Sequence, residues 1–368
     1  VARRGQRHTR IAREVESPLK ATVVALEAVE EGGRSTDSAV FVSCDLCKVE
    51  GVLANAVRER VEKRISDLDT SRIWLSGTHT HTAPVMIEGL YQIPAEGVMQ
   101  PPEYVEFAAA RISEAIEQAW KNRQSGGVSW GLGHAVVAHN RRAVYANGNA
   151  DMYGSTSRPD FRHIEGYEDH GVEALFFWDQ NASLQAVAVN VACPAQEVES
   201  RSKINADFWH PVRQELKKRY GEQLCVLGWC GAAGDQSPHL MFRDASERRM
   251  RQGRGLTRLE EIARRLVDAV EEAHQVAREH IETDVKFTHK VQQLELDRRD
   301  IPESRYRSAK KELAALKQKD SDGLERWWRE RLVGNYEQGG VYKMNLHSLR
   351  IGDVAICSND FELFTDFG

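Results

Sequence analysis

The sequence has no long hydrophobic run and no excess of positive charge. No stretch approaches the roughly 18 uninterrupted apolar residues that a membrane-spanning helix needs. Lysine and arginine total 50 against 55 aspartates and glutamates, which gives a formal net charge of −5. A nucleic-acid-binding surface is therefore not the default expectation, because such surfaces are usually basic. With 41% hydrophobic and 29% charged residues, the composition is that of an ordinary globular protein.

Cysteine is also scarce, with 6 in 368 residues, and its spacing excludes a zinc ribbon. Cys44 and Cys47 form a Cys-x-x-Cys at the end of an apolar run, but no second pair completes a zinc knuckle. Two buried free thiols are the favoured interpretation. The chain begins with Val1 rather than methionine or a signal peptide, and it ends at Gly368 just after an apolar run. We expect a single domain over 1–368 that is truncated at both ends, with its compartment undetermined.

Hydrophobic periodicity predicts strands alternating with helices, and hence an α/β fold with a mixed sheet covered by helices. Two runs, 174–178 and 186–191, are apolar on both faces, which is typical of central strands. A charged stretch at about 299–335 predicts a peripheral helical insertion with a solvated outer face. The predicted strands cover 39–43, 72–76, 135–138, 172–178, 184–192, 224–230 and 284–297, and the predicted helices 51–66, 102–120 and 256–281.

The segment 77–84, Gly-Thr-His-Thr-His-Thr-Ala-Pro, is the most informative motif. It follows the predicted strand 72–76, and in extended backbone His79 and His81 project from the same face. Two such imidazoles can both bind a metal, or one can bind a metal while the other contacts a substrate. Neutral imidazole is a common zinc ligand.

A second polar segment, 229–239, follows the apolar run 224–230. Its glycines allow close approach of a substrate and present backbone amides as oxyanion donors. Ser237 is a candidate nucleophile outside the Gly-x-Ser-x-Gly elbow, so its hydroxyl would need activation by a metal or a nearby histidine.

Five segments together carry a family resemblance: 42–46, 77–84, 140–142, 234–238 and 361–368. With them, the chain resembles the N-terminal catalytic domain of the neutral/alkaline (non-lysosomal) ceramidases, particularly divergent bacterial relatives. The His-Thr-His and Gly-Asp-x-Ser-Pro segments are the specific ones. The resemblance implies a zinc-dependent amidase with a serine nucleophile, acting on a lipid or other small-molecule substrate in a secreted or periplasmic setting.

Residue by residue, the resemblance implies that His79 and Glu362 bind zinc and that Ser237 is the nucleophile. His81 would face the substrate and stabilise the tetrahedral intermediate, and Arg141 would contact the amide or its developing oxyanion. A further zinc-binding tyrosine of the family would lie beyond Gly368.

The sequence departs from the family at one implied zinc ligand, where a His-Pro pair is replaced by Cys193-Pro194. Cys193 would serve as the ligand, because thiolate binds zinc well. Two alternatives stay open: the site has lost its metal, or the alignment is shifted and His210 serves instead.

Three functions follow from these motifs. The first is zinc-dependent hydrolysis of an amide in an N-acylated lipid such as ceramide. The second is an esterase or deacetylase acting on glycans or other polar conjugates, which the polar loop 162–170 favours and an apolar tunnel beside Ser237 would not. The third is a metal-free binding protein derived from the enzyme, motivated by Cys193.

Overall fold

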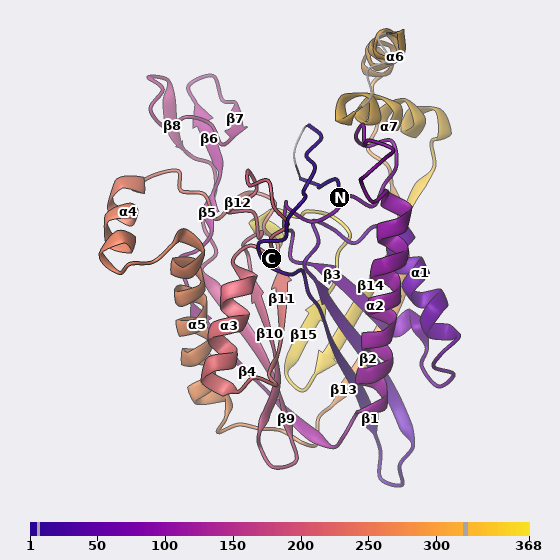
Figure 1. Cartoon of the computed structure of the whole chain (residues 1–368), viewed down its shortest axis with the longest axis vertical. Helices are drawn as coiled ribbons and strands as arrows, with labels where there is room; N and C mark the ends of the chain where they lie inside the picture. Colours follow the sequence, from indigo (N-terminus) through magenta and orange to yellow (C-terminus); the bar gives the residue numbers. More distant parts are fainter. Residues whose placement is uncertain (6–7, 319–322) are drawn as a thin grey trace.

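The structure is a computed structural model that describes residues 1–5, 8–318 and 323–368, and it confirms the mixed α/β architecture. Two sheets pack face to face, and helices cover the outer face of each. Figure 1 shows this order of layers, with α3 and α5 on one side, α1 and α2 on the other, and the strands between them. The predicted central strands are thus covered by helices on one face and by a second sheet on the other.

The first sheet has the order β1-β2-β3, with β2 antiparallel to β1 and parallel to β3. Val40, Val42 and Cys44 of β2 pack toward the helices, whereas Phe41 packs toward the second sheet, as the two-residue period of a strand requires. The elements of this half are β1 (Ala21–Val29), β2 (Ser35–Cys44), α1 (Gly51–Glu62), η1 (Thr70–Arg72), β3 (Ile73–Gly77) and α2 (Pro101–Lys121).

The second sheet has the order β11-β10-β9-β4, and only its β10–β11 pair is parallel. Phe176 and Val187 pack toward α3 and α5, whereas Leu175 and Ala188 pack toward the first sheet. The elements of this half are β4 (Gly126–His134), β9 (Gly171–Asp179), β10 (Leu184–Val191), α3 (Trp209–Tyr220), β11 (Cys225–Cys230) and α5 (Arg258–Ala277).

Local sequence signals explain the main helices. Leu53, Val57 and Val61 of the predicted stripe are fully buried on α1, which ends at Glu62 rather than at the predicted residue 66. At the start of α5, the Thr257 side chain accepts a hydrogen bond from the Glu260 amide, and the Glu260 carboxylate accepts one from the Thr257 amide. This reciprocal cap satisfies two amides that the helix leaves unpaired.

The strand predicted at 135–138 is wrong, because the strand β4 ends at His134 and a turn follows. The inward positions of β4 include Gly131, so the sequence lacks the apolar alternation that marks a strand. A Cβ at Gly131 would lie 2.7 Å from the Ala273 carbonyl oxygen of α5. The close packing of helix on strand therefore requires glycine and hides the strand signal.

Smaller elements surround the two-sheet core. A third sheet, β13-β14-β15, contributes Leu349 and Ile351 to the core between the sheets. The helices α6 and α7 form in the predicted helical stretch at about 299–335, although α7 continues to Gln338, and they lie together at one end of the molecule (Figure 1). The remaining elements are β5 (His139–Asn140), β6 (Arg142–Tyr145), β7 (Ala150–Met152), β8 (Phe161–Ile164), β12 (Gln236–Ser237), α4 (Asp244–Gly253), β13 (Phe287–Asp297), α6 (Glu303–Gln318), α7 (Leu324–Gln338), β14 (Val341–Ile351), β15 (Val354–Cys357) and η2 (Thr365–Phe367).

A buried ion pair fixes the loop that follows β2. The carboxylate of Asp45, 1% exposed, accepts two hydrogen bonds from the guanidinium of Arg213 on α3, at 2.7 and 2.9 Å. It also accepts the Lys20 amide at 2.9 Å and the Thr78 hydroxyl at 3.3 Å. One side chain therefore joins the ends of β2 and β3 to a helix of the other half.

We predict that Asp45→Ala lowers the free energy of unfolding by roughly 3–5 kcal/mol, because it leaves the Arg213 charge buried without its partner. Urea unfolding followed by circular dichroism measures the change. As a control, Glu30→Ala removes an exposed partner of Arg34 and should leave the unfolding midpoint nearly unchanged. Equal midpoints for the two variants would contradict the structural role of Asp45.

Candidate active site

The candidate site lies where the parallel strands β2 and β3 end. Cys44 and Gly77 are paired at the ends of these strands. The chains then stay together, because the Thr78 amide donates to the Cys44 carbonyl and the His79 amide donates to the Leu46 carbonyl, both at 2.9 Å. The loop after β2 and the histidine loop after β3 therefore run side by side.

The prediction of an extended His79–His81 segment is wrong, although the two rings do come together. The strand β3 ends at Gly77, and His79 has a left-handed φ of 66°. This conformation costs a non-glycine residue about 1–2 kcal/mol, and such strain is concentrated at functional sites. The ring centroids of His79 and His81 are 4.9 Å apart.

Cys47 joins these two histidines in a group that can hold a metal. The ligand atoms of Cys47, His79 and His81 all lie within 4.8 Å of one another. Among the described residues, no other group of three or more potential ligands comes this close together. The carboxylate of Glu362 is adjacent, with its Oε1 3.8 Å from His79 Nε2.

Cys193 and His210 are not members of this group. Cys193 is fully buried in the core beneath α3 and α5, and its Sγ lies 3.6 Å from the Val137 carbonyl oxygen and 3.8 Å from that of Pro194. Burial raises the pKa of its thiol well above the ordinary value, which disfavours the thiolate that a metal needs.

The Cys-x-x-Cys pair divides between two environments. Cys44 is buried between β2 and the helices, as predicted, and burial raises its pKa to about 12. Cys47 is only partly buried and lines the cavity at the histidines, so the prediction of a buried thiol is wrong at this position. Both are free cysteines.

The two histidines have opposite electrostatic environments. Burial, together with the charges of His81 and Arg141, lowers the pKa of His79 to about 3. Burial would also lower the pKa of His81, but the contacts with Cys47 and Glu199 raise it to about 10. The Glu199 Oε2 lies 2.6 Å from His81 Nδ1, so a carboxylate fixes the orientation of this ring.

A cavity of about 370 Å³ opens over this group. The sequence-predicted residues His79, His81, Arg141 and Glu362 line it together. The helix α7 also lines the cavity, through Trp327, Trp328 and Arg331, which the sequence pattern did not predict. The other residues of the wall are Gln196, Cys47, Lys48 and Arg4.

The hydroxyl of Ser237 lies next to this cavity but is itself fully buried in β12. Three donors converge on its oxygen: the Tyr153 hydroxyl at 3.1 Å, Gln196 Nε2 at 3.3 Å and the His239 amide at 3.1 Å. Donors directed at one oxygen stabilise negative charge on it.

Arg141 connects the serine to the metal-capable group. Its NH1 donates to the Tyr153 hydroxyl at 2.9 Å, and its NH2 lies 3.3 Å from Glu362 Oε1. Gln196 Nε2 also donates to the Tyr153 hydroxyl, at 2.7 Å. Sequence reasoning missed Tyr153 and Gln196. Pairing of β6 with β7 brings the Tyr153 amide to the Arg141 carbonyl at 2.6 Å, a contact that no local motif reveals.

Three polar atoms in the wall of the cavity are buried and have no hydrogen-bond partner among the described residues. These are the donor Nε of Arg141, the acceptor Oε1 of Gln196 and the donor NH1 of Arg4. A buried polar atom without a partner is costly, so such atoms point to groups that a ligand satisfies.

The Gly-Asp motif positions the C-terminal segment beside the serine. Asp235 Oδ1 accepts the Thr365 amide at 2.9 Å and its hydroxyl at 2.8 Å. A Cβ at Gly234 would lie 2.6 Å from the Glu362 carbonyl oxygen, so only glycine permits this approach. These two residues therefore place Glu362 opposite His79.

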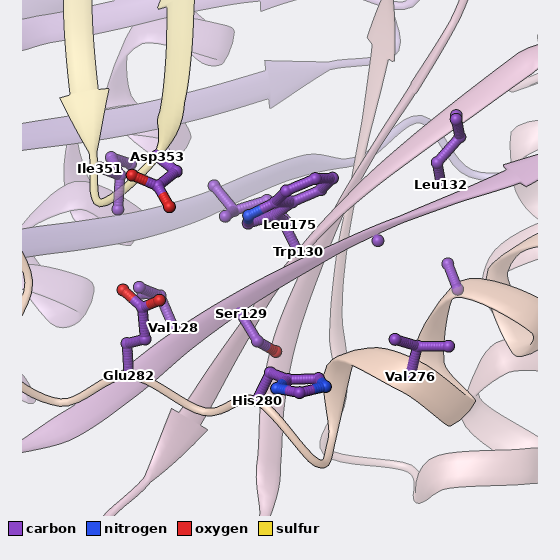
Figure 2. A pocket seen from close by; sticks show the side chains of 12 residues that line it. Val128, Ser129, Trp130, Leu132, Leu175, Val276, His280, Glu282, Ile351 and Asp353 are labelled. Carbon is purple, nitrogen blue, oxygen red and sulfur yellow. The ribbon is translucent and has the colours of Figure 1, made fainter.

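A second cavity, of about 360 Å³, is formed by β4, α5 and the turn after β14, and it shares no lining residue with the first. Figure 2 shows that Trp130, Leu132 and Val276 line it together with His280 and Glu282. The hydroxyl of Ser129 accepts a hydrogen bond from the indole of Trp178 at 2.8 Å. The serine of this second cavity is thus held by a hydrogen bond from Trp178, and the group of residues that can hold a metal lines the first cavity.

Comparison with known proteins identifies the fold. No family model matches the sequence, and no curated protein matches it. Two solved structures share the fold: a ceramidase complexed with C2, at a TM-score of 0.63, and the neutral ceramidase from Pseudomonas aeruginosa, at 0.58. Sequence identity is 14% in each case, over 97% and 92% of this chain. The chain spans about three fifths of their length, 60% and 62%. None of the described helices is both long and apolar enough to cross a bilayer.

Proposed function

We propose that this protein hydrolyses the amide bond of an N-acylated lipid such as ceramide, with Ser237 as the nucleophile and zinc as the cofactor. The ceramidase fold supports this proposal, but at 14% identity the argument rests on the site. Two of the three unpartnered atoms in the cavity wall, those of Arg141 and Gln196, carry it. An amide offers a carbonyl acceptor to Arg141 Nε and an N–H donor to Gln196 Oε1, and thus satisfies both. An ester has no N–H and would satisfy only the arginine.

The reaction would proceed by acyl transfer to the serine. The Ser237 hydroxyl would lose its proton as its oxygen bonds to the carbonyl carbon of the amide, and the carbonyl oxygen would gain a negative charge that Arg141 would stabilise. The C–N bond would then break, and the leaving amine would take up the proton that the serine lost. Water next cleaves the acyl-serine ester and releases the carboxylic acid. Because Ser237 is buried, Tyr153 and Gln196 would yield to the substrate as it binds.

The residues at the base of the cavity suit zinc. Imidazole nitrogen, thiolate sulfur and carboxylate oxygen are all zinc ligands, and His79 and Glu362 present two of these types 3.8 Å apart. His79 and Glu362 would hold the ion. When bound, zinc would supply a Lewis acid for the carbonyl and lower the pKa of the nucleophile. Cys193 is not needed for this donor set.

Ser237→Ala tests the nucleophile. We expect kcat to fall by a factor on the order of 10⁴ or more on a short-chain N-acyl-sphingosine, while the fold and the metal content stay unchanged. Liberated fatty acid measures turnover. Ser157→Ala, at an exposed serine, is the matched control and should retain full activity. Retained turnover in the Ser237 variant would exclude the assignment.

Gln196→Met tests the selectivity for amides. The variant removes the acceptor that the substrate N–H needs, so we expect kcat/KM on the amide to fall about 10- to 100-fold. Because Gln196 also contacts Ser237, some loss on the matching ester is expected, and the informative quantity is the amide-to-ester ratio. An unchanged amide-to-ester ratio of kcat/KM would show that Gln196 does not accept a hydrogen bond from the amide N–H.

A second candidate substrate follows from the charge of the cavity. Its wall contains four cationic side chains and a single carboxylate, Glu362. Lys48 and Arg4 both contact Glu50, and Arg141 contacts Glu362. The fourth cation, Arg331, has its guanidinium carbon 5.1 Å from the centroid of the Trp327 ring and has no ion-pair partner among the described residues. The four cations of the wall are therefore Arg4, Lys48, Arg141 and Arg331. Such a cavity favours a polar conjugate that carries an anionic group.

The loop 162–170 gives no support to this second candidate. Glu165 pairs with Arg142, and Glu168 lies 3.3 Å from His139 Nδ1 and 3.5 Å from His170 Nε2. None of the loop residues lines the cavity. The preference for an anionic conjugate therefore rests on Arg331 and its neighbours alone.

Arg331→Gln distinguishes the two substrate classes. For an N-acyl amino acid, whose carboxylate can meet Arg331, we expect kcat/KM to fall roughly 10-fold, because a charge-assisted hydrogen bond is lost. For neutral ceramide of the same acyl length we expect little change. Arg350→Gln, on the exposed surface of β14, is the control. An equal effect on both substrates would argue against recognition of an anion.

A further inference from the structure

The geometry around Cys47 points to a metal ligand that lies outside the predicted set. Its Sγ is within 4.8 Å of the ligand atoms of both His79 and His81. All three side chains line the same cavity. Two imidazoles around one thiol, with an open cavity beyond them, are the arrangement of a catalytic zinc site that keeps one position free.

The backbone holds Cys47 rigidly in this place. The loop after β2 packs so closely against β3 that a Cβ at Gly77 would lie 2.9 Å from the Leu46 carbonyl oxygen. The Cys47 backbone also hydrogen-bonds the His79 ring. The Asp45–Arg213 ion pair anchors the same loop two residues earlier. A ligand needs such support, because a metal site tolerates little variation in position.

The surroundings of His81 match those of a ligating histidine. Its Nδ1 lies 2.6 Å from Glu199 Oε2, and its backbone carbonyl accepts a hydrogen bond from Arg10 at 2.7 Å. Metal-binding histidines usually donate one ring N–H to a carboxylate, which leaves the other nitrogen for the metal. Glu199 therefore directs Nε2 of His81 toward the ion.

We infer that Cys47, His79 and His81 bind the metal ion, so that Cys47 supplies the sulfur ligand in place of Cys193. His81 is then a ligand rather than the substrate-facing imidazole that the family resemblance implies. Glu362 is then not a ligand, as it was in the donor set proposed above, but lies beside the open position. The inference rests on the proposed function only for the choice of zinc. Metal binding itself can be measured without turnover.

Cobalt(II) replacement tests the sulfur ligand. After removal of metal with a chelator, Co²⁺ added to the full chain should produce a near-ultraviolet thiolate-to-cobalt absorption band. The band should disappear in Cys47→Ser and persist in the matched controls Cys193→Ala and Cys230→Ala. Cys230 is included because its thiol interacts with Glu362. A band that disappears only in the Cys193 variant would overturn the inference.

Zinc affinity provides a second readout. Glu199→Gln should weaken zinc binding by roughly 10- to 100-fold, as expected for loss of a ligand's hydrogen-bond partner, and Cys47→Ser should weaken it further. Bound Zn²⁺ should protect Cys47 of the unmodified chain from iodoacetamide, measured by peptide mapping, so the test does not depend on any variant folding. Rapid alkylation of Cys47 at saturating Zn²⁺ would overturn the inference and leave Cys47 as a reactive thiol paired with His81.

These readouts separate the two proposals. A cobalt–thiolate band without amide hydrolysis would confirm the ligand and contradict the proposed function. Metal-dependent hydrolysis without a band, or with a band that survives in Cys47→Ser, would support the function and contradict the ligand.

Discussion

The buried ion pair between Asp45 and Arg213 is the contact on which the site depends. Two charges withdrawn from water are stable only when each satisfies the other, and here both carboxylate oxygens accept guanidinium hydrogen bonds. The pair fixes the end of β2 against α3, and the Thr78 hydroxyl adds the end of β3. Because β2 and β3 are parallel and end in register, fixing one loop fixes the other. The metal-capable group is the direct consequence.

The rest of the site is brought to this point by close backbone packing together with the contacts of the Asp235 and Arg141 side chains. Asp235 binds the Thr365 amide and hydroxyl, and Gly234 lets the C-terminal segment approach the serine loop. Glu362 thereby reaches His79, and Arg141 spans the distance from Glu362 to Tyr153 and the serine. Ser237 and the metal-capable group are thus two ends of one network of hydrogen bonds and charged contacts.

The fold and the cavity favour different substrates. The fold is shared with ceramidases, whose substrate amide suits the unpartnered atoms of Arg141 and Gln196. Trp327 and Trp328 of α7 add an aromatic wall suited to an acyl chain. A neutral lipid, however, offers no anion to Arg331, the one cation of the cavity wall that has no ion-pair partner among the described residues. An N-acyl compound with an acidic group near the amide would satisfy all of these features, and the arginine on α7 is the feature that separates it from ceramide.

The sequence by itself determined part of the element order and four residues of the cavity, whereas the strands β1, β4 and β14 were not predicted. Hydrophobic period is local, so the helices α1, α2 and α5 and the central strands were predictable, and motifs identified His79, His81, Arg141 and Glu362, which the structure brings to one cavity. Only the tertiary structure decided the positions of the cysteines relative to the histidines. Whether Cys47 or Cys193 faces the histidines depends on strand register and on which side chains enter the core, and neither leaves a local pattern. Tyr153, Gln196 and the wall from α7 likewise arise from long-range packing, because each contacts residues far away in the chain.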